Sequence, residues 1–240
     1  MKKTFIAASL MIAMAGTVQA AEWGYKGDKG PEHWGDVAKE CATGKNQSPI
    51  DIKDVVDAEL MPLNIEYQGM VTGLTNNGHT LQAVVEGNNA VTVDGVEFNL
   101  AQFHFHTPSE NHIRGQNFPL EAHFVNADKD GNLAVVAVMY NAAPGENNQI
   151  TQLTATMPEP GETVRLQTPF AVKDMLPATG EYYRFNGSLT TPPCSEGVRW
   201  FVLKSAQALT TEQAKQMQMV MGNNNRPIQK QNARVVLTND

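Results

Sequence analysis

The chain has 240 residues, of which 41% are hydrophobic and 18% are charged, and its formal net charge is −7. This length allows one large domain or two small ones, and the apolar fraction is sufficient for a sizeable core. The charged fraction is too low for a disordered acidic protein, and the sequence has no basic patch or stripe of the kind that binds nucleic acid.

The first twenty residues have the pattern of a secretory signal peptide. Lys2 and Lys3 give a positive start, residues 5–15 form an apolar run, and Val18-Gln19-Ala20 fits a small-x-small cleavage site. The apolar run is too short for a transmembrane helix, and no later run is long enough to span a membrane. We therefore expect export to a bacterial periplasm, with cleavage after residue 20.

Two cysteines, Cys41 and Cys194, lie beyond the predicted cleavage site. In an oxidising compartment an even number of cysteines favours one disulfide. Two free, buried thiols remain the alternative on this reasoning alone.

Short strand patterns dominate residues 21–240, and neither a repeat nor a linker divides them, so one domain is expected. Residues 91–98 are typical of a hairpin with Asp94-Gly95 as its tight turn. Further strands are predicted at residues 102–106, 120–125, 133–140 and 200–204. The third of these four is a continuous apolar run, which is typical of a strand buried on both faces.

Helical patterns are few. Residues 211–221 are the clearest, because Thr210 and Gln213 form a capping-box pattern at their start. The spacing of Met217, Val220 and Met221 favours packing of this helix on the core. Short helices are also predicted at residues 148–157 and 169–176. The fold class is therefore mostly β (α+β), with a few short peripheral helices.

Three histidines occur in predicted strands. His104 and His106 are two residues apart, so both imidazoles point to one face of their strand. His123 lies in the next predicted strand. Three neutral imidazoles with an open fourth position are typical of a catalytic zinc site. Gln102 and Glu121 are in phase with these histidines and could each accept an N–H from a metal-bound imidazole.

The spacing alone also allows an arrangement without a metal, because a His-x-His pair on a strand is often a surface or cation-stacked pair. His33 and His112 have no comparable context, and we interpret both as structural or surface residues. A zinc peptidase is disfavoured, since the sequence has no His-Glu-x-x-His helix.

Several ordered motifs extend this pattern over most of the chain. They are Trp23-Gly-Tyr25, Gln47-Ser-Pro-Ile50, Asn76-Asn-Gly-His79, Gln102-Phe-His-Phe-His106, Glu121-Ala-His123, Ser188-Leu-Thr-Thr-Pro-Pro193 and Asn224-Asn-Arg-Pro227. Together they resemble the alpha-class carbonic anhydrase family. The two cysteines also fall where bacterial members of that family carry a disulfide.

The resemblance implies a large twisted, mainly antiparallel sheet and one Zn²⁺ per chain, held by His104, His106 and His123. It implies reversible hydration of carbon dioxide to bicarbonate and a proton, through attack by a zinc-bound hydroxide. Thr190 would orient that hydroxide and donate its own proton to Glu110. A related protein that only binds ligands would have lost one of these residues.

Other roles also follow from the resemblance. Thr191 would help to bind bicarbonate, and Tyr25 and His79 would lie along the proton path, with His79 as the shuttle. The apolar substrate pocket would consist of Val125, Val135, Leu189, Val198 and Trp200; ordinary core positions are the alternative from the sequence alone. Inhibition by sulfonamides and small anions is implied, and the chain is expected to be a monomer or homodimer.

One departure from the family pattern is visible. Thr107-Pro108 follows His106, where the family often continues with Trp-Gly. We expect this change to alter the rim of the cavity and to leave the ligands unchanged.

Overall fold

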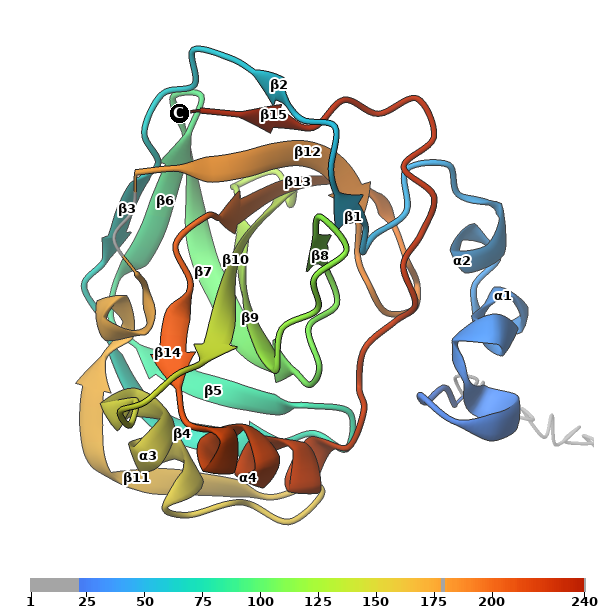
Figure 1. Cartoon of the computed structure of the whole chain (residues 1–240). Coiled ribbons are helices and arrows are strands. Elements are labelled where there is room, and N and C mark those ends of the chain that lie inside the picture. Colours follow the sequence, from blue (N-terminus) through green and yellow to red (C-terminus); the bar gives the residue numbers. More distant parts are fainter. Residues whose placement is uncertain (1–21, 178–179, 240) are drawn as a thin grey trace, which may run out of the picture.

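The computed structural model describes residues 22–177 and 180–239, so the predicted signal peptide at residues 1–20 lies outside the described residues. A twisted sheet of thirteen strands dominates the described part, and a two-stranded sheet lies beside it (Figure 1). Most strand pairs are antiparallel; the parallel ones are β10–β13, β10–β14, β15–β2 and β1–β8. The mostly β, mainly antiparallel fold class is confirmed.

The strands are β1 (Asp51–Ile52), β2 (Val56–Asp57), β3 (Asn64–Tyr67), β4 (Met70–Asn76), β5 (Leu81–Glu86), β6 (Asn89–Val93), β7 (Val96–His106), β8 (His112–Ile113), β9 (Leu120–Ala127), β10 (Leu133–Ala142), β11 (Thr163–Ala171), β12 (Tyr182–Ser188), β13 (Glu196–Leu203), β14 (Gln207–Leu209) and β15 (Leu237–Thr238). In the large sheet the main order is β11-β4-β5-β7-β9-β10-β13-β12-β15-β2. The strands of the predicted hairpin and of the histidine motifs, β6, β7 and β9, are therefore close together in this sheet.

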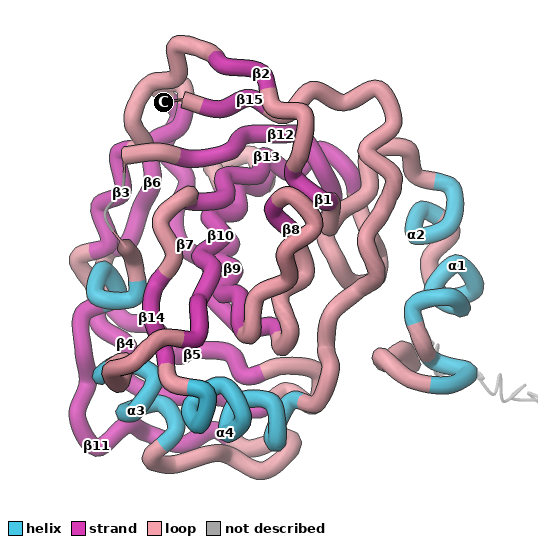
Figure 2. Tube along the Cα trace, in the orientation of Figure 1, coloured by secondary structure: helices cyan, strands magenta, loops and turns pink. Residues whose placement is uncertain are grey.

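The helices are short and lie at the periphery (Figure 2). They are α1 (Trp34–Val37), α2 (Glu40–Thr43), α3 (Asn148–Thr154) and α4 (Thr211–Met221), with 3-10 turns η1 (Gly27–Lys29), η2 (Pro31–His33) and η3 (Val172–Met175). None of the helices in the described part of the chain has the length and apolar content that a membrane crossing needs.

Helix α4 has the predicted bounds, and its capping box is complete, because Thr210 and Gln213 exchange side-chain to backbone hydrogen bonds. Met217 is fully buried in the core, and Val220 and Met221 pack against it, as predicted.

The helix predicted at residues 169–176 is wrong over its first half. Phe170 and Ala171 belong to β11 and pair with Val71 and Met70 of β4, and only the single turn η3 follows. Sheet pairing overrides the weak local helical preference there. The helix predicted at residues 148–157 exists but already ends at Thr154.

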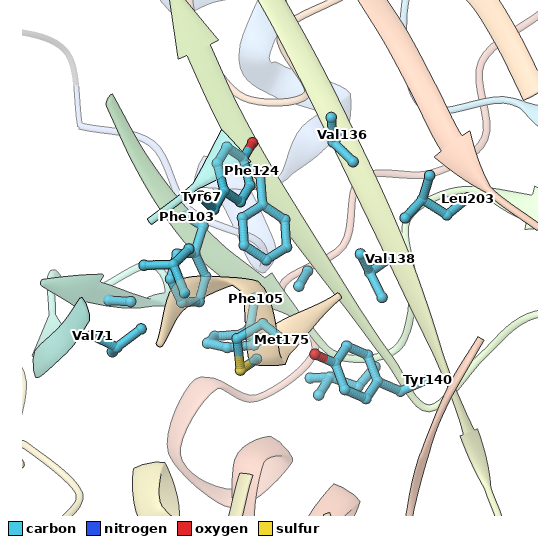
Figure 3. Close-up of a cluster of buried hydrophobic side chains, with 14 of the residues drawn as sticks. Tyr67, Val71, Phe103, Phe105, Phe124, Val136, Val138, Tyr140, Met175 and Leu203 are labelled. Atoms are coloured by element: carbon cyan, nitrogen blue, oxygen red, sulfur yellow. The ribbon is translucent and has the colours of Figure 1, made fainter. Parts of the chain in front are cut away.

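The sheet carries a different core on each of its faces. One cluster contains stacked aromatic rings, with Phe103 and Phe124 at 4.6 Å between ring centroids and Phe105 beside them (Figure 3). The other cluster contains Val135 and Trp200. Because side chains alternate along a strand, burial of Phe103 and Phe105 turns the intervening histidine of β7 toward the second face.

Cys41 and Cys194 form a disulfide across 153 residues of sequence. The predicted disulfide is therefore present, and the alternative of two free thiols is excluded. The bond joins α2, near the N-terminus, to the loop between β12 and β13.

Reduction of this disulfide should destabilise the protein. A cross-link over a long loop removes conformational entropy from the unfolded chain, so we expect its loss to lower the free energy of unfolding by about 2–4 kcal/mol. Urea unfolding of oxidised and fully reduced protein, with free thiols counted by mass spectrometry, measures the difference. Identical unfolding midpoints for the two forms would show that the bond contributes nothing.

Candidate active site

The three predicted histidine ligands meet at one point of the sheet. His104 on β7 lies directly opposite His123 on β9 in the antiparallel register, and His106 is two residues further along β7. One nitrogen of each imidazole lies within 4.8 Å of the corresponding nitrogens of the other two. The strand period and the register thus bring together three side chains from two strands.

Each imidazole has a polar partner close to its other ring nitrogen. Nδ1 of His104 lies 2.8 Å from Oε1 of Gln102, and Nδ1 of His106 lies 2.7 Å from the carbonyl oxygen of Asn224. Nε2 of His123 lies 2.9 Å from Oε1 of Glu121. The nitrogens that converge are therefore Nε2 of His104, Nε2 of His106 and Nδ1 of His123. Of these, Nε2 of His106 is buried and makes no hydrogen bond.

The electrostatics favour neutral imidazoles at His104 and His106. Burial holds the pKa of His104 well below its usual value, and the neighbouring histidines lower it further. Burial also lowers the pKa of His106, although the Asn224 carbonyl opposes this. Neutral imidazole is the form that binds zinc, so the residues present fit a zinc ion with three protein ligands and an open position.

Glu121 is fully buried, and it is held as a carboxylate. Burial alone would raise the pKa of Glu121, but His123 and hydrogen bonds from Asn111 outweigh it and bring the pKa below the usual value. The backbone N–H groups of Glu110 and Asn111 donate to Oε2 at 2.7 and 2.9 Å, and Nδ2 of Asn111 donates to Oε1 at 2.8 Å. A carboxylate fixed in this way orients the His123 ring and keeps its proton on Nε2.

A second buried carboxyl group, Glu110, lies beside the triad. Its Oε2 is 3.5 Å from Nε2 of His106 and 3.8 Å from Nδ1 of His123, and its Oε1 accepts from the backbone N–H of Arg226 at 2.8 Å. Burial raises the pKa of Glu110 to about 7, and the His123, Arg226 and Thr190 groups lower it in part. Oε2 has no hydrogen-bond partner, and the hydroxyl of the buried Thr190 favours the carboxylate form of Glu110 by lowering its pKa.

A cavity of about 140 Å³ opens onto two of the histidines. Besides these two histidines, its lining includes four predicted site residues, Tyr25, His79, Gln102 and Thr191. The complete lining is Trp23, Tyr25, Asn77, His79, Thr80, Gln82, Gln102, His104, His106 and Thr191. The histidine motif, the N-terminal motif and the loop before β13 therefore meet around one space.

Two aromatic groups along this cavity differ in how they can handle protons. His79 is half-buried and stacks on Trp23 with 3.9 Å between ring centroids. Burial lowers the pKa of His79, and the charge of Glu22 opposes that shift. Burial raises the pKa of the Tyr25 hydroxyl, so Tyr25 keeps its proton near neutral pH.

The five apolar residues predicted for the substrate pocket gather on the histidine face of the sheet. Val135, Val198 and Trp200 are buried there, with the partly buried Val125 and Leu189 packed against them. The Trp200 ring lies edge-on to His123, with 4.9 Å between centroids. None of the five lines the cavity described above; they adjoin the triad on the side of His123.

The expectation that Thr107 alters the rim of the cavity is wrong. Thr107 is fully buried, does not line the cavity, and donates from its hydroxyl to the carbonyl oxygen of Gly222 at 2.7 Å. A small hydroxyl at this position satisfies a carbonyl at the C-terminal end of α4. The departure from the family pattern thus lies under the site and not at its rim.

Two groups that support the site were not predicted from the sequence. One is the Asn224 carbonyl behind His106. The other is Arg226, which is 3% exposed and donates from its guanidinium to Oε1 of Gln47 at 2.9 Å and to the carbonyl oxygens of Ser48 and Cys41 at 2.8 and 3.0 Å. Both residues belong to the motif Asn224-Asn-Arg-Pro227. The resemblance of this motif to the family was the only feature of the sequence that pointed to them.

Comparison with known proteins decides the family. The model of the eukaryotic-type carbonic anhydrase family matches residues 29–240. The chain belongs to this family. It is 45% identical over 220 residues to a carbonic anhydrase of Neisseria gonorrhoeae, which covers 90% of this chain and 87% of that protein. The family resemblance inferred from the motifs is confirmed, and so is the assignment as a carbonic anhydrase.

Solved structures agree with this assignment. The alpha-carbonic anhydrase of Photobacterium profundum is 56% identical, with a TM-score of 0.88 over 90% of this chain and 100% of that chain. The alpha-carbonic anhydrase of Thermovibrio ammonificans, solved in complex with the inhibitor sulfanilamide, is 47% identical, with a TM-score of 0.87 over 90% of this chain and 99% of that chain.

Proposed function

We propose that this enzyme catalyses the reversible hydration of carbon dioxide to bicarbonate and a proton, with one zinc ion held by His104, His106 and His123. The observation that carries the proposal is the convergence of three imidazoles, of which His106 and His123 are buried and His104 is half-buried, each with a polar partner at its other ring nitrogen. When bound, zinc supplies a hydroxide nucleophile near neutral pH by lowering the pKa of water to about 7, a value established for carbonic anhydrases.

Thr190 and Glu110 orient the reacting oxygen. With its hydrogen directed to the Glu110 carboxylate, the Thr190 hydroxyl can only accept a hydrogen bond from the nucleophile on its other side. The lowering of the Glu110 pKa by the Thr190 hydroxyl and the burial of both residues support this arrangement. The nucleophile then presents a lone pair, not its hydrogen, to the carbon of the substrate.

The apolar cluster beside His123 suits an apolar, linear substrate. Carbon dioxide has no hydrogen to donate and a low cost of desolvation, so Val125, Val135, Leu189, Val198 and Trp200 can receive it without leaving a polar group unpaired. Thr191 lines the cavity on the polar side, where its hydroxyl can hydrogen-bond to bicarbonate. The two sides of the site thus match the change in polarity from substrate to product.

Each turnover releases a proton, and His79 is positioned to carry it. Its imidazole shares the cavity with His104 and His106 and is partly open to solvent. Tyr25 lines the same cavity and stays protonated, so we assign it to ordering the path and not to titrating. Histidine is the side chain whose pKa suits proton transfer near neutral pH.

Replacing His79 with alanine should lower kcat at least several-fold and leave kcat/KM for carbon dioxide nearly unchanged. A group of pKa about 7 releases protons directly to water at no more than on the order of 10³ s⁻¹, the product of 10⁻⁷ M and the diffusion limit. Hydration itself does not involve His79, so kcat/KM is retained. Stopped-flow hydration in dilute, weak buffer measures both constants.

Added imidazole should restore part of the lost kcat of the His79→Ala variant. An unchanged kcat in this variant would assign the proton path to other groups.

We also propose that the mature protein acts in the periplasm, after removal of residues 1–20. The disulfide supports export, because such bonds persist in oxidising compartments. Sulfonamides and small anions are proposed inhibitors, since a relative has been solved with sulfanilamide. The proposed quaternary state is a monomer or homodimer.

Inhibition by sulfanilamide tests the proposed function. Purified protein should hydrate carbon dioxide in a stopped-flow assay, and sulfanilamide should abolish this activity at saturation. Absence of hydration in folded protein with a full complement of zinc would contradict the proposal.

A further inference from the structure

The side chain of Asn224 joins two parts of the active site. It is completely buried in the segment that follows α4. Its Oδ1 accepts from the backbone N–H of Thr107 at 2.8 Å, and its Nδ2 donates to the carbonyl oxygens of Phe105 at 2.9 Å and His79 at 3.1 Å. Only this orientation of the amide directs hydrogens to carbonyls, so three backbone groups define its position.

The partners of Asn224 come from the two places between which a proton must move. Phe105 and Thr107 flank the ligand His106 in β7, and the carbonyl oxygen of Asn224 also accepts from Nδ1 of His106. His79 lies in the turn between β4 and β5, next to the C-terminal end of α4 (Figure 1). One buried residue therefore ties the strand of a metal ligand to the turn that carries the shuttle histidine.

A second link holds the same turn through the Thr80 side chain. The Thr80 hydroxyl donates to the carbonyl oxygen of Phe105, and Sδ of Met221 lies 3.7 Å from Oγ1 of Thr80 and 3.8 Å from Nδ2 of Asn224. The contacts of Thr80 with Phe105 and Met221 remain when the Asn224 amide is removed. Its removal should therefore shift His79 without unfolding the turn.

We propose that the side-chain amide of Asn224 is a positioning group for proton transfer, which sets the place of His79 relative to the metal site. This inference rests on the proposed shuttle role of His79. Asn224 does not touch the reacting atoms and acts only through the backbone of His79. Because a misplacement of about 1 Å can reduce a rate by about 100-fold, one lost backbone contact is sufficient for a measurable effect.

The test begins with Asn224→Ala, which removes the amide and retains the carbonyl group that fixes His106. We expect kcat to fall about tenfold, while kcat/KM and zinc content stay near the wild-type values. Asn224→Ser, which leaves a smaller void but is too short to reach His79, should behave in the same way. Asn223→Ala is the matched control, because Asn223 is exposed and its side chain contacts Gln218; it should keep the wild-type kcat.

A double-mutant cycle separates positioning from a merely structural role. In a His79→Ala background, Asn224→Ala should cause no further loss of kcat, because both changes remove the same step. Added imidazole should raise kcat in both single variants and in the double variant. Circular dichroism establishes that each variant is folded.

The other outcomes are distinguishable. A further loss in the double variant, or loss of zinc from Asn224→Ala and Asn224→Ser, would overturn the inference and place the amide in support of the metal site. A wild-type kcat in Asn224→Ala beside a low kcat in His79→Ala would overturn this inference alone. A wild-type kcat in His79→Ala would overturn the shuttle assignment and this inference with it.

Discussion

Replacing His106 with alanine should remove zinc from the purified protein and lower kcat/KM by about 10³-fold or more. His106 is one of the three proposed ligands, it is 1% exposed, and its Nε2 makes no hydrogen bond. Two imidazoles cannot hold the zinc ion with the same affinity as three. Zinc acts as a Lewis acid and contributes several kcal/mol to transition-state stabilisation. A loss of about 1.4 kcal/mol corresponds to a tenfold loss in rate.

The measurement combines zinc content by mass spectrometry with stopped-flow hydration. His33→Ala is the control, because His33 is exposed in η2 and lies outside the cavity. It should keep one zinc per chain and wild-type activity. A His106→Ala variant that retains stoichiometric zinc and full activity would refute the ligand assignment.

Thr190→Ala should keep zinc bound and lower kcat/KM by about 100-fold. The ligands are untouched, but the nucleophile loses the acceptor that orients it; removal of one such preorganised hydrogen-bonding group costs about 10²–10³-fold in other enzymes. Glu110→Gln should act in the same direction, because an amide nitrogen facing Thr190 would compete for the hydroxyl lone pair. Both effects should appear in kcat/KM, unlike that of His79→Ala.

Thr190→Ser is the matched control for this prediction. It keeps the hydroxyl and should recover most of the activity, whereas Thr190→Ala does not. Equal kcat/KM values for the alanine variant and the wild type, with equal zinc content, would remove Thr190 from the mechanism.

Local patterns predicted the part of the site that depends on strand geometry. The spacing of His104 and His106 and the phase of Glu121 with His123 follow from the two-residue period of a strand, and the structure has both. The Asp94-Gly95 hairpin turn is present for a similar reason, since only residues tolerant of positive φ suit it: φ is 51° at Asp94 and 77° at Gly95.

Groups contributed by distant backbone could not be predicted in this way. The Asn224 carbonyl lies 118 residues from His106 in sequence, and a carbonyl leaves no signature in residue type. The buried position of Thr107 likewise depends on where α4 ends, which the local sequence of β7 does not encode. Motif resemblance identified the segment of Asn224 but not its contacts.

The apolar side of the site shows a different difficulty. Val135, Val198 and Trp200 have the same hydrophobic character as the ordinary core residue Val136, and both groups are buried. Periodicity assigns them to one face of the sheet, but core and substrate pocket require the same residue types. Only the family resemblance separated the two interpretations, and their role remains a prediction.

Zinc titration of metal-free protein tests the central claim most directly. Protein stripped with a chelator is titrated with zinc while carbon dioxide hydration is followed by stopped flow, and folding is monitored throughout. We predict that activity is absent without metal, rises linearly, and reaches its maximum at one zinc per chain. Full hydration activity in folded, metal-free protein, or no activity at one zinc per chain, would contradict the account.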